Sequence, residues 1–242
     1  MTSQLEAVLN AAKALGHRTG ENPALWRGHL DNLLPKSEKL SRGHHSAMPY
    51  KEVAAFYRKI VANPPNSNLA LCFTILTAAR SGETRGAVWS EIDREQRLWT
   101  IPAERMKAGR EHAVPLTDAA IAILDIMEKQ RAEAGFIFPG ARKGPLSVMA
   151  LTMAMRRADA GDFTPHGFRS SFRDWAGDET SFQRDDIETC LAHAVRDQTE
   201  RAYRRGNALD KRREIMRTWA GYLTTEKIEA DNVIPMVRGY PS

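Results

Sequence analysis

The chain has 242 residues, of which 42% are hydrophobic and 27% charged, so it is long and apolar enough to fold around a true core. Its 35 Lys and Arg exceed its 30 Asp and Glu, which fits a polyanionic partner without requiring one. No signal peptide is recognisable, and no apolar run approaches the roughly 18 residues of a membrane span. We therefore expect a soluble, cytoplasmic protein without a membrane partner.

The N-terminal part predicts two helices and a linker. Residues 3–15 carry apolar side chains at helical spacing. A second helix is predicted to begin at Asn22, as its N-cap, and to run to Pro35. Because two helices are too few to bury their own apolar stripe, residues 1–35 are interpreted as the tail of a helical domain whose beginning is missing. Residues 36–48 are polar, basic and without periodicity, and predict a linker.

A new organisation begins at Pro49, with helices predicted at 50–62 and 69–79. The second of these is apolar almost all round, which places it at the centre of the core. Arg80 follows it directly, and Glu83 lies three residues further on in the box T-A-A-R-S-G-E. A guanidinium at the end of a buried helix is held rigidly, and a carboxylate beside it can orient it or a neighbouring imidazole. If this box stood alone, a surface Arg–Glu ion pair after the end of a helix would be the default interpretation.

Between residues 92 and 117 the spacing of apolar residues changes from that of helices to that of strands. Segments 97–102 and 111–117 are short and rich in β-branched and aromatic residues, and they predict a hairpin turned at Gly109. We expect 88–92 to complete a three-stranded sheet. Lys107 is predicted at the tip of the hairpin, where a flexible ammonium can reach a neighbouring groove. After the hairpin, helices are predicted at 118–135 and, with Ser147 as N-cap, at 147–160.

The stretch from 163 to 204 carries the densest chemistry. A helix starting at Pro165 would put His166 and Arg169 on one face of its first turn. Another helix is predicted from about residue 185, with His193 at or just past its end and Tyr203 ten residues later in a basic helix. A phenol in the company of histidines and arginines indicates a phosphate site with a tyrosine nucleophile. No cysteine or carboxylate cluster lies near enough to suggest a metal.

Five boxes, in the order T-A-A-R-S-G-E, M-K-A-G-R, H-G-F-R, L-A-H and A-Y-R-R, resemble those of the tyrosine recombinase family. The resemblance is closest to the phage-type integrases of genomic islands and satellite phages, and it covers about residues 49–219. Many members have Gly where Ala192 stands, and T-G-x-R where this chain has T-A-A-R; both changes keep every functional group. The expected fold is mainly α with a small antiparallel β-sheet, an α+β class, which is the family's catalytic-domain fold.

The resemblance also implies a domain organisation. Residues 1–35 would be the C-terminal helices of a truncated core-binding domain, 36–48 a linker, 49–223 the catalytic domain and 224–242 a C-terminal tail. An apolar stripe between residues 209 and 223 marks the last helix. That helix would pack either on its own domain or, as in the family, on a neighbouring protomer.

For catalysis, the resemblance implies that Tyr203 attacks the scissile DNA phosphate, giving a 3′-phosphotyrosine and a free 5′-hydroxyl. Arg80, Arg169 and His193 would neutralise the phosphate oxygens, which replaces the metal ions of other nucleases. Since one phosphodiester is exchanged for another through the covalent link, no ATP, metal or other cofactor is expected.

Proton transfer would fall to two further side chains. Lys107 would protonate the leaving 5′ oxygen, and His166 would take the proton of the tyrosine hydroxyl. Glu83 would hold the group together. The expected site therefore consists of Arg80, Lys107, His166, Arg169, His193 and Tyr203, with Glu83 in support.

The implied function is site-specific recombination that integrates or excises a prophage or genomic island. Expected partners are double-stranded DNA at attachment sites, other protomers in a DNA-bound tetramer, and accessory DNA-bending or directionality factors, in a bacterial cytoplasm and at the nucleoid when active. Two alternatives stay open. One is a nicking and closing enzyme like type IB topoisomerases, and the other is a DNA-binding protein that keeps the fold without cleaving.

Overall fold

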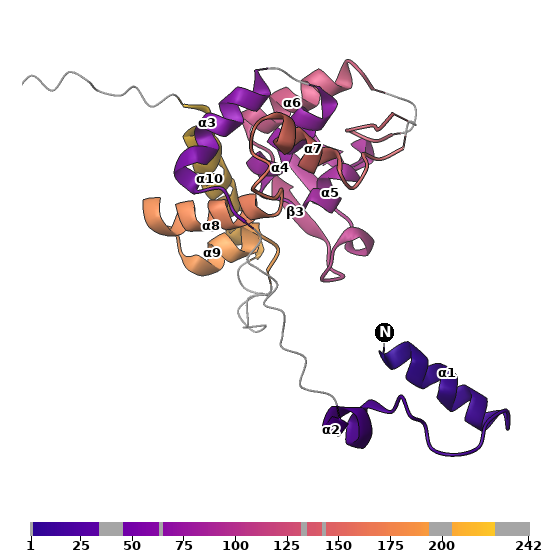
Figure 1. Ribbon diagram of the computed structural model, residues 1–242. Helices are drawn as coiled ribbons and strands as arrows, with labels where there is room; N and C mark the ends of the chain where they lie inside the picture. The colour runs from indigo at the N-terminus through magenta and orange to yellow at the C-terminus, as the bar shows by residue number, and fades with distance from the viewer. Residues whose placement is uncertain are drawn as a thin grey trace, which may run out of the picture. The chain divides into compact units, whose positions relative to one another are not determined.

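The computed structural model describes residues 2–33, 46–62, 65–131, 135–141, 144–193 and 205–225. The chain forms two compact units, Met1–His44 and His45–Ser242 (Figure 1). Tyr203, the expected nucleophile, and most of the expected tail lie outside the described residues. Across the described part of the chain, no helix combines the length and the hydropathy that crossing a bilayer requires.

In the first unit, α1 (Thr2–Ala14) forms as its apolar spacing predicts. Asn22 is buried and fastens the following loop to this helix. Its side-chain nitrogen donates to the carbonyl oxygen of Glu6, at 2.9 Å, and to Oδ1 of Asn10, at 2.7 Å. Its Oδ1 accepts the N–H of Ala24 at 2.9 Å, which closes a short turn. Asn22 therefore organises a loop rather than the start of a long helix.

The prediction of one continuous helix from Asn22 to Pro35 is wrong. The chain instead passes through η1 (Trp26–Leu30) and a single turn, α2 (Asp31–Leu33). The physical reason lies within η1, where Arg27 is extended, with ψ 127°, and Gly28 has φ 78°. Glycine adopts this left-handed conformation at no steric cost, and the helical hydrogen-bond series is interrupted there.

The second unit is mainly helical around a small sheet, and the predicted α+β class is confirmed. Its elements are, in order, α3 (Tyr50–Val61), α4 (Asn66–Thr77), α5 (Ser81–Arg85), η2 (Trp89–Glu91), β1 (Ile92–Asp93), β2 (Leu98–Ile101), η3 (Ala103–Arg105), β3 (His112–Pro115), α6 (Asp118–Glu128), α7 (Ala150–Arg157), α8 (Gly167–Glu179), α9 (Arg184–Cys190) and α10 (Arg205–Thr224).

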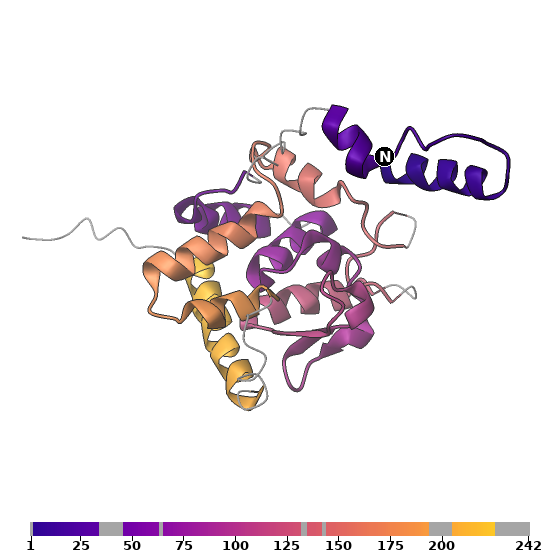
Figure 2. The same cartoon turned by 90° about the horizontal axis from the view of Figure 1, so that it is seen from below.

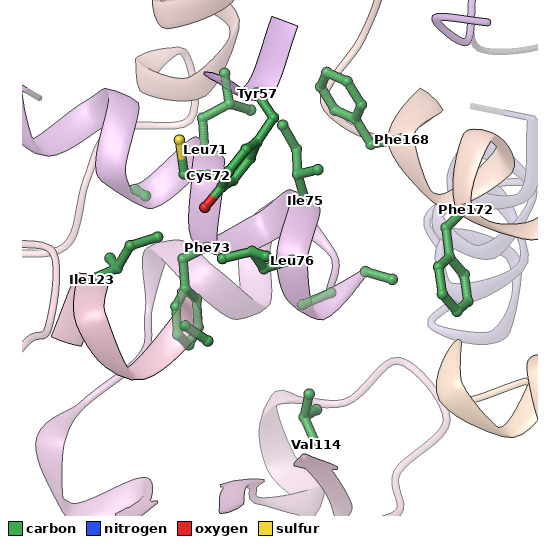
Figure 3. Packing of buried hydrophobic residues seen from close by; sticks show 14 of the residues in the cluster. Tyr57, Leu71, Cys72, Phe73, Ile75, Leu76, Val114, Ile123, Phe168 and Phe172 are labelled. Atoms are coloured by element: carbon green, nitrogen blue, oxygen red, sulfur yellow. The ribbon is translucent and has the colours of Figure 1, made fainter. Parts of the chain in front are cut away.

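Helix α4 is the centre of the second unit, as its all-round apolar pattern predicts. Every residue from Leu69 to Thr77 is buried, and the helix packs against α3, α6, α7 and α10. Figure 3 shows Phe73 among these packed side chains. Its ring lies 5.3 Å from that of Trp99 and 5.5 Å from that of Phe138. The end of α4 is therefore a fixed point from which Arg80 emerges.

The sheet is antiparallel in the order β1, β2, β3, and β2 pairs with β3 in the register Ile101 opposite His112. Gly109 has φ 60° in the connection, as its predicted turn role requires. The predicted first strand, 88–92, is corrected to β1. Residues 89–91 form η2 instead, because Glu91 turns inward, where its Oε2 accepts the indole N–H of Trp99 at 2.9 Å.

Two helix boundaries also differ from the predictions. Helix α6 ends at Glu128 rather than Gly135, and Gly135 has φ 74°, which a helix cannot continue through. Ser147 is not an N-cap, since α7 begins only at Ala150 and has no side-chain cap. The preceding loop holds the backbone in place: Gly140 N–H bonds the oxygen of Gly144 at 2.8 Å.

Helix α10 packs in the core of its own unit, which is one of the two arrangements expected for its apolar stripe. Ile215, Met216, Trp219 and Leu223 are fully buried. The indole N–H of Trp219 donates to the carbonyl oxygen of Ile75 in α4 at 2.9 Å. Figures 1 and 2 show α8, α9 and α10 side by side, in agreement with their contacts. Among the described residues, this helix is a structural part of the second unit.

Candidate active site

Arg80 is aimed by a chain reversal at the end of α4. Ala78 has φ 49° and donates its N–H to the oxygen of Ile75, which ends the helix. Arg80 then runs extended into α5. Glu83, whose side chain is 5% exposed, fixes it twice: Oε2 accepts the Arg80 backbone N–H and Oε1 accepts Nη1, both at 2.7 Å. The predicted orienting role of Glu83 thus has a geometric basis.

Arg169 lies in the first turn of α8 and is buried. Its guanidinium donates to the carbonyl oxygen of Ala78 through Nη1 and to that of Leu191 through Nη2, the latter at 2.6 Å. Burial lowers the pKa of Arg169 to about 10, and the like charge of Arg80 adds to this lowering. The group remains protonated at neutral pH, so two positive charges are held near each other.

His193 follows α9 through another reversal, in which Ala192 has φ 51°. Its Nε2 lies 3.3 Å from Nη2 of Arg169, and its Nδ1 lies 2.5 Å from Oε2 of Glu188. The backbone N–H of His193 also bonds the carbonyl oxygen of Glu188 at 3.0 Å. The imidazole is therefore held on both nitrogens.

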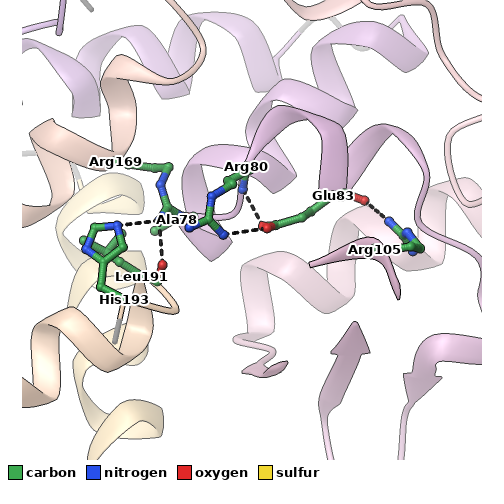
Figure 4. A network of polar contacts seen from close by, with 7 residues as sticks. All are labelled: Ala78, Arg80, Glu83, Arg105, Arg169, Leu191 and His193. Atoms are coloured by element: carbon green, nitrogen blue, oxygen red, sulfur yellow. Dashed lines mark hydrogen bonds and ion pairs between the residues drawn. The ribbon is translucent and has the colours of Figure 1, made fainter. Parts of the chain in front are cut away.

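Four of the predicted side chains thus meet in one network: Arg80, Glu83, Arg169 and His193. Figure 4 shows them together, contributed by the end of α4, by α5, by α8 and by the segment after α9. Two guanidiniums and an imidazole in one place form an electropositive site. This arrangement can bind a phosphate through several charge-assisted hydrogen bonds.

The other predicted residues, Lys107, His166 and Tyr203, are not among the four side chains of this network. Lys107 is exposed in the hairpin connection, and it has no hydrogen-bond or ion-pair partner among the described residues. His166 is exposed at the N-terminus of α8, three residues before Arg169. Tyr203 lies outside the described residues. The roles of these three side chains therefore stay predictions.

Arg105 supports the site from the side of the hairpin, and the sequence alone did not identify it. Arg105 donates through Nη2 to the carbonyl oxygen of Glu83 and pairs through Nη1 with Glu91. This ties the base of the hairpin that carries Lys107 to the helix that carries Glu83. The only signal was the location of Arg105 beside the box of Lys107, two residues earlier.

His112 on β3 was missed as well. Burial lowers its pKa to about 4, with a further contribution from Arg212, while Glu83 and a hydrogen bond to the backbone of Cys190 oppose the shift. The ring is therefore neutral at pH 7 and lies close to the charges of the site. Alternation along the strand was an available signal, because His112 shares a face with buried Val114.

In the part of the chain that the structure describes, no group of three or more His, Cys, Asp or Glu side chains could hold a metal ion. The arginines and the imidazole are the groups available to balance the charge of an anion.

Comparison with known proteins shows to which family the chain belongs. The model of the "Phage integrase family" matches residues 48–209, more than half of the chain. Prophage integrase IntA of Escherichia coli (strain K12) is 40% identical over 149 residues, which cover 60% of this chain and 36% of that relative. Prophage integrase IntZ of the same strain is 32% identical over 197 residues, covering 80% of this chain and 48% of that relative. The chain thus spans about half of these relatives or less.

Solved structures give the same fold. The crystal structure of a lambda integrase (75-356) dimer bound to a COC′ core site has a TM-score of 0.54 and 22% identity, over 80% of this chain and 70% of that one. At this identity the likeness concerns the fold alone. The family match extends over the whole stretch that carries Arg80, Arg169 and His193, and the chain belongs to the phage integrase family, the tyrosine recombinases.

Proposed function

We propose that the chain acts as a site-specific DNA recombinase, an integrase, that cleaves and rejoins double-stranded DNA at attachment sites. The observation that carries this proposal is the cluster of Arg80, Arg169 and His193. Phosphoryl transfer is catalysed mainly by positioning and by neutralising charge on the phosphate oxygens, and fixed cationic donors supply both. The product would be the integration or excision of a prophage or genomic island.

In the proposed mechanism, each side chain of the expected site has its own role. Tyr203 attacks the scissile phosphate, the 5′ oxygen leaves, and a 3′-phosphotyrosine forms. Arg80 and Arg169 bind the non-bridging oxygens, and His193 donates a further hydrogen bond to them. Lys107 delivers a proton to the leaving 5′ oxygen, and His166 accepts the proton of the tyrosine hydroxyl. Glu83 orients Arg80, which its two bonds of 2.7 Å support.

Partners are proposed from the relatives, because the chain spans only 36% of IntA and 48% of IntZ. Solved lambda integrase structures include a dimer bound to a core site and a tetramer bound to a Holliday junction. We extend both kinds of partner, DNA and further protomers, to this chain. Residues 1–35 are then the end of a core-binding domain, 49–223 the catalytic domain, and the working location is the DNA of the bacterial cytoplasm.

The nucleophile is tested by Tyr203→Phe. The substrate is a pool of nicked duplexes with a randomised core, since a nick beside the scissile bond releases a short strand and traps the covalent adduct. Protein–DNA species that survive denaturation are collected from the wild type at low salt and sequenced. Tyr203→Phe should abolish the adduct while leaving DNA binding in place, because it removes the one atom that changes partners.

Tyr222→Phe is the matched control. The Tyr222 hydroxyl donates to the carbonyl oxygen of Tyr50 at 3.1 Å, its ring stacks on Trp219, and burial raises its pKa, so it is occupied in packing. This variant should form the adduct normally. Adduct retained by Tyr203→Phe and lost by Tyr222→Phe would reverse the assignment. Plasmid relaxation without strand exchange between two duplexes would favour a nicking and closing enzyme instead.

A further inference from the structure

His193 is held by one residue through both its backbone and its ring. The carbonyl oxygen of Glu188 accepts the His193 N–H at 3.0 Å, and Oε2 of the same residue lies 2.5 Å from Nδ1. The reversal at Ala192 brings the ring back over the end of α9, so that both contacts form at once. Glu188 itself is largely shielded, with 16% of its side chain exposed.

The carboxylate of Glu188 also forms an ion pair with a residue of α8. Arg173 Nε lies 2.8 Å from Oε1 of Glu188, and Arg169, one turn earlier on the same helix, donates to the oxygen of Leu191. Two arginines at i and i+4 therefore hold the two sides of the segment that presents His193. The imidazole of His193 is thus contacted on both ring nitrogens.

We propose that Glu188 is a positioning residue for His193, an inference that rests on the proposed function of the site. A carboxylate only accepts hydrogen bonds, so the contact with Nδ1 requires a proton on Nδ1. The neutral ring then carries its lone pair on Nε2, which faces the guanidinium of Arg169 at 3.3 Å. Glu188 thus selects the tautomer and directs Nε2 to the phosphate-binding groups.

The carboxylate of Glu188 also reduces the repulsion between positive charges at the site. A doubly protonated His193 can donate from Nε2 to a phosphate oxygen, but it adds a third positive charge beside Arg80 and Arg169. Glu188 supplies a negative charge at hydrogen-bond distance from the same ring and reduces this repulsion. Its effect reaches Arg169 too, whose protonated form it favours.

The test measures the tautomer directly, on the whole chain labelled with ¹⁵N in its histidines. His193→Gln identifies the His193 signals in the NMR spectra. In the wild type we expect Nδ1 to be protonated, with a proton resonance at low field from the short bond to Glu188. Glu188→Ala should lose that resonance to exchange and shift the ring toward the Nε2–H tautomer. Glu188→Gln keeps an acceptor, so it should keep the tautomer but move the resonance to higher field.

Asp185→Asn is the matched control, since it removes one negative charge from the same helix at an exposed position. Its His193 signals should match those of the wild type. With the trapped-adduct substrates, Glu188→Ala should slow adduct formation about 10- to 100-fold, as the loss of an outer partner does for metal-bound histidines. Glu188→Gln should recover part of the rate.

Unchanged His193 resonances in both Glu188 variants would overturn the proposal, and so would an unchanged rate. If Glu188→Ala does not fold, the position of the proton resonance in Glu188→Gln decides. A wild type that forms no adduct on any sequence would count against the proposed function alone, because the NMR spectra report on Glu188 without DNA.

Discussion

Arg169 is held by carbonyl oxygens rather than by a carboxylate. Its hydrogen bonds to Ala78 and Leu191 satisfy donors without cancelling the charge, and both carbonyls belong to reversals that end helices. Arg80, by contrast, is paired with Glu83. The site therefore keeps a positive charge that is rigidly placed, which is the condition for stabilising a charged transition state without reorganisation.

Lys107 is proposed as a proton donor and Arg169 as a ligand of the phosphate oxygens, so the two should respond differently to a change of leaving group. Lys107→Ala should slow cleavage of an ordinary substrate, but a 5′-bridging phosphorothiolate should largely restore the rate, because a thiolate leaves without protonation. Arg169→Ala should lose at least about 100-fold in rate and should not be restored, because the oxygens it binds are unchanged. Rates of adduct formation on both substrates measure this. An equal response of the two variants would reduce Lys107 to a contact with the DNA backbone.

His112 makes stability depend on pH. Its pKa is about 4 in the folded protein against 6.5 as the ordinary value, so between these values the unfolded chain binds more protons. Stability should therefore fall as the pH drops from about 6.5 to 4, by roughly 2–3 kcal/mol in total. His112→Gln retains a donor for the backbone of Cys190 but does not titrate, and this part of the loss should disappear.

Urea unfolding at pH 7 and pH 4.5 measures this difference between the two proteins. His17→Gln, at an exposed histidine of the first unit, is the control and should keep the wild-type dependence. An identical loss of stability in the wild type and His112→Gln would show that the ring of His112 protonates freely in the folded state.

At the level of elements, the sequence predicted regular helices well and their interruptions poorly. The spacing of apolar residues located α1 and marked α4 as central, since burial of one face or of the whole helix leaves a periodic pattern. The helices predicted at 50–62 and from about 165 and 185 correspond to α3, α8 and α9. Apolar spacing gives no signal where a single residue changes the direction of the backbone. Gly28 breaks an otherwise helical pattern in the first unit, and Glu91 turns a strand-like segment inward to meet Arg105.

The left-handed Ala192 offers a prediction about the segment that carries His193. A non-glycine residue at φ 51° pays a steric cost, so Ala192→Gly should raise the free energy of unfolding by about 0.5–1 kcal/mol. The control is Ala122→Gly, at an exposed position inside α6, which should lower stability by about 1 kcal/mol. Chemical denaturation of both variants measures the difference. A loss of stability in Ala192→Gly would mean that the flexibility of the unfolded chain outweighs the relief.

Helix α10 supports a prediction about folding. The ring of Trp219 packs 4.8 Å from that of Trp175 and 5.5 Å from that of Phe172, and it bonds α4. Trp219→Ala should cost about 3–5 kcal/mol, as large buried aromatics do. Arg217→Ala, exposed on the same helix, should change stability by less than about 0.5 kcal/mol. Thermal unfolding compares them, and small losses in both variants would mean that α10 is not part of the core.

At the scale of the whole molecule, the site joins segments that are distant in the sequence. Arg80, Arg169 and His193 could be named because each stands at a helix end that the sequence marks. Glu188 could not, since its bond to His193 depends on the reversal at Ala192. His112 escaped for a similar reason, because its neighbours come from α5, α8 and α10 as well as from its own hairpin.

The basic segment of residues 36–42 leads to the last prediction. If its Lys and Arg side chains neutralise phosphates of the bound DNA, their charges contribute to affinity. Replacing Lys36, Lys39 and Arg42 by Gln in the whole chain should reduce the slope of log affinity against log salt by up to about 0.9 for each phosphate that the variant no longer neutralises. The variant with Lys36→Arg and Lys39→Arg keeps every charge and should keep the slope. Adduct yield at saturating protein should not change in either case, because Arg80, Arg169 and His193 lie in the second unit. Binding measured from low to moderate salt separates the outcomes, and equal slopes for all three proteins would place the DNA contacts elsewhere on the chain.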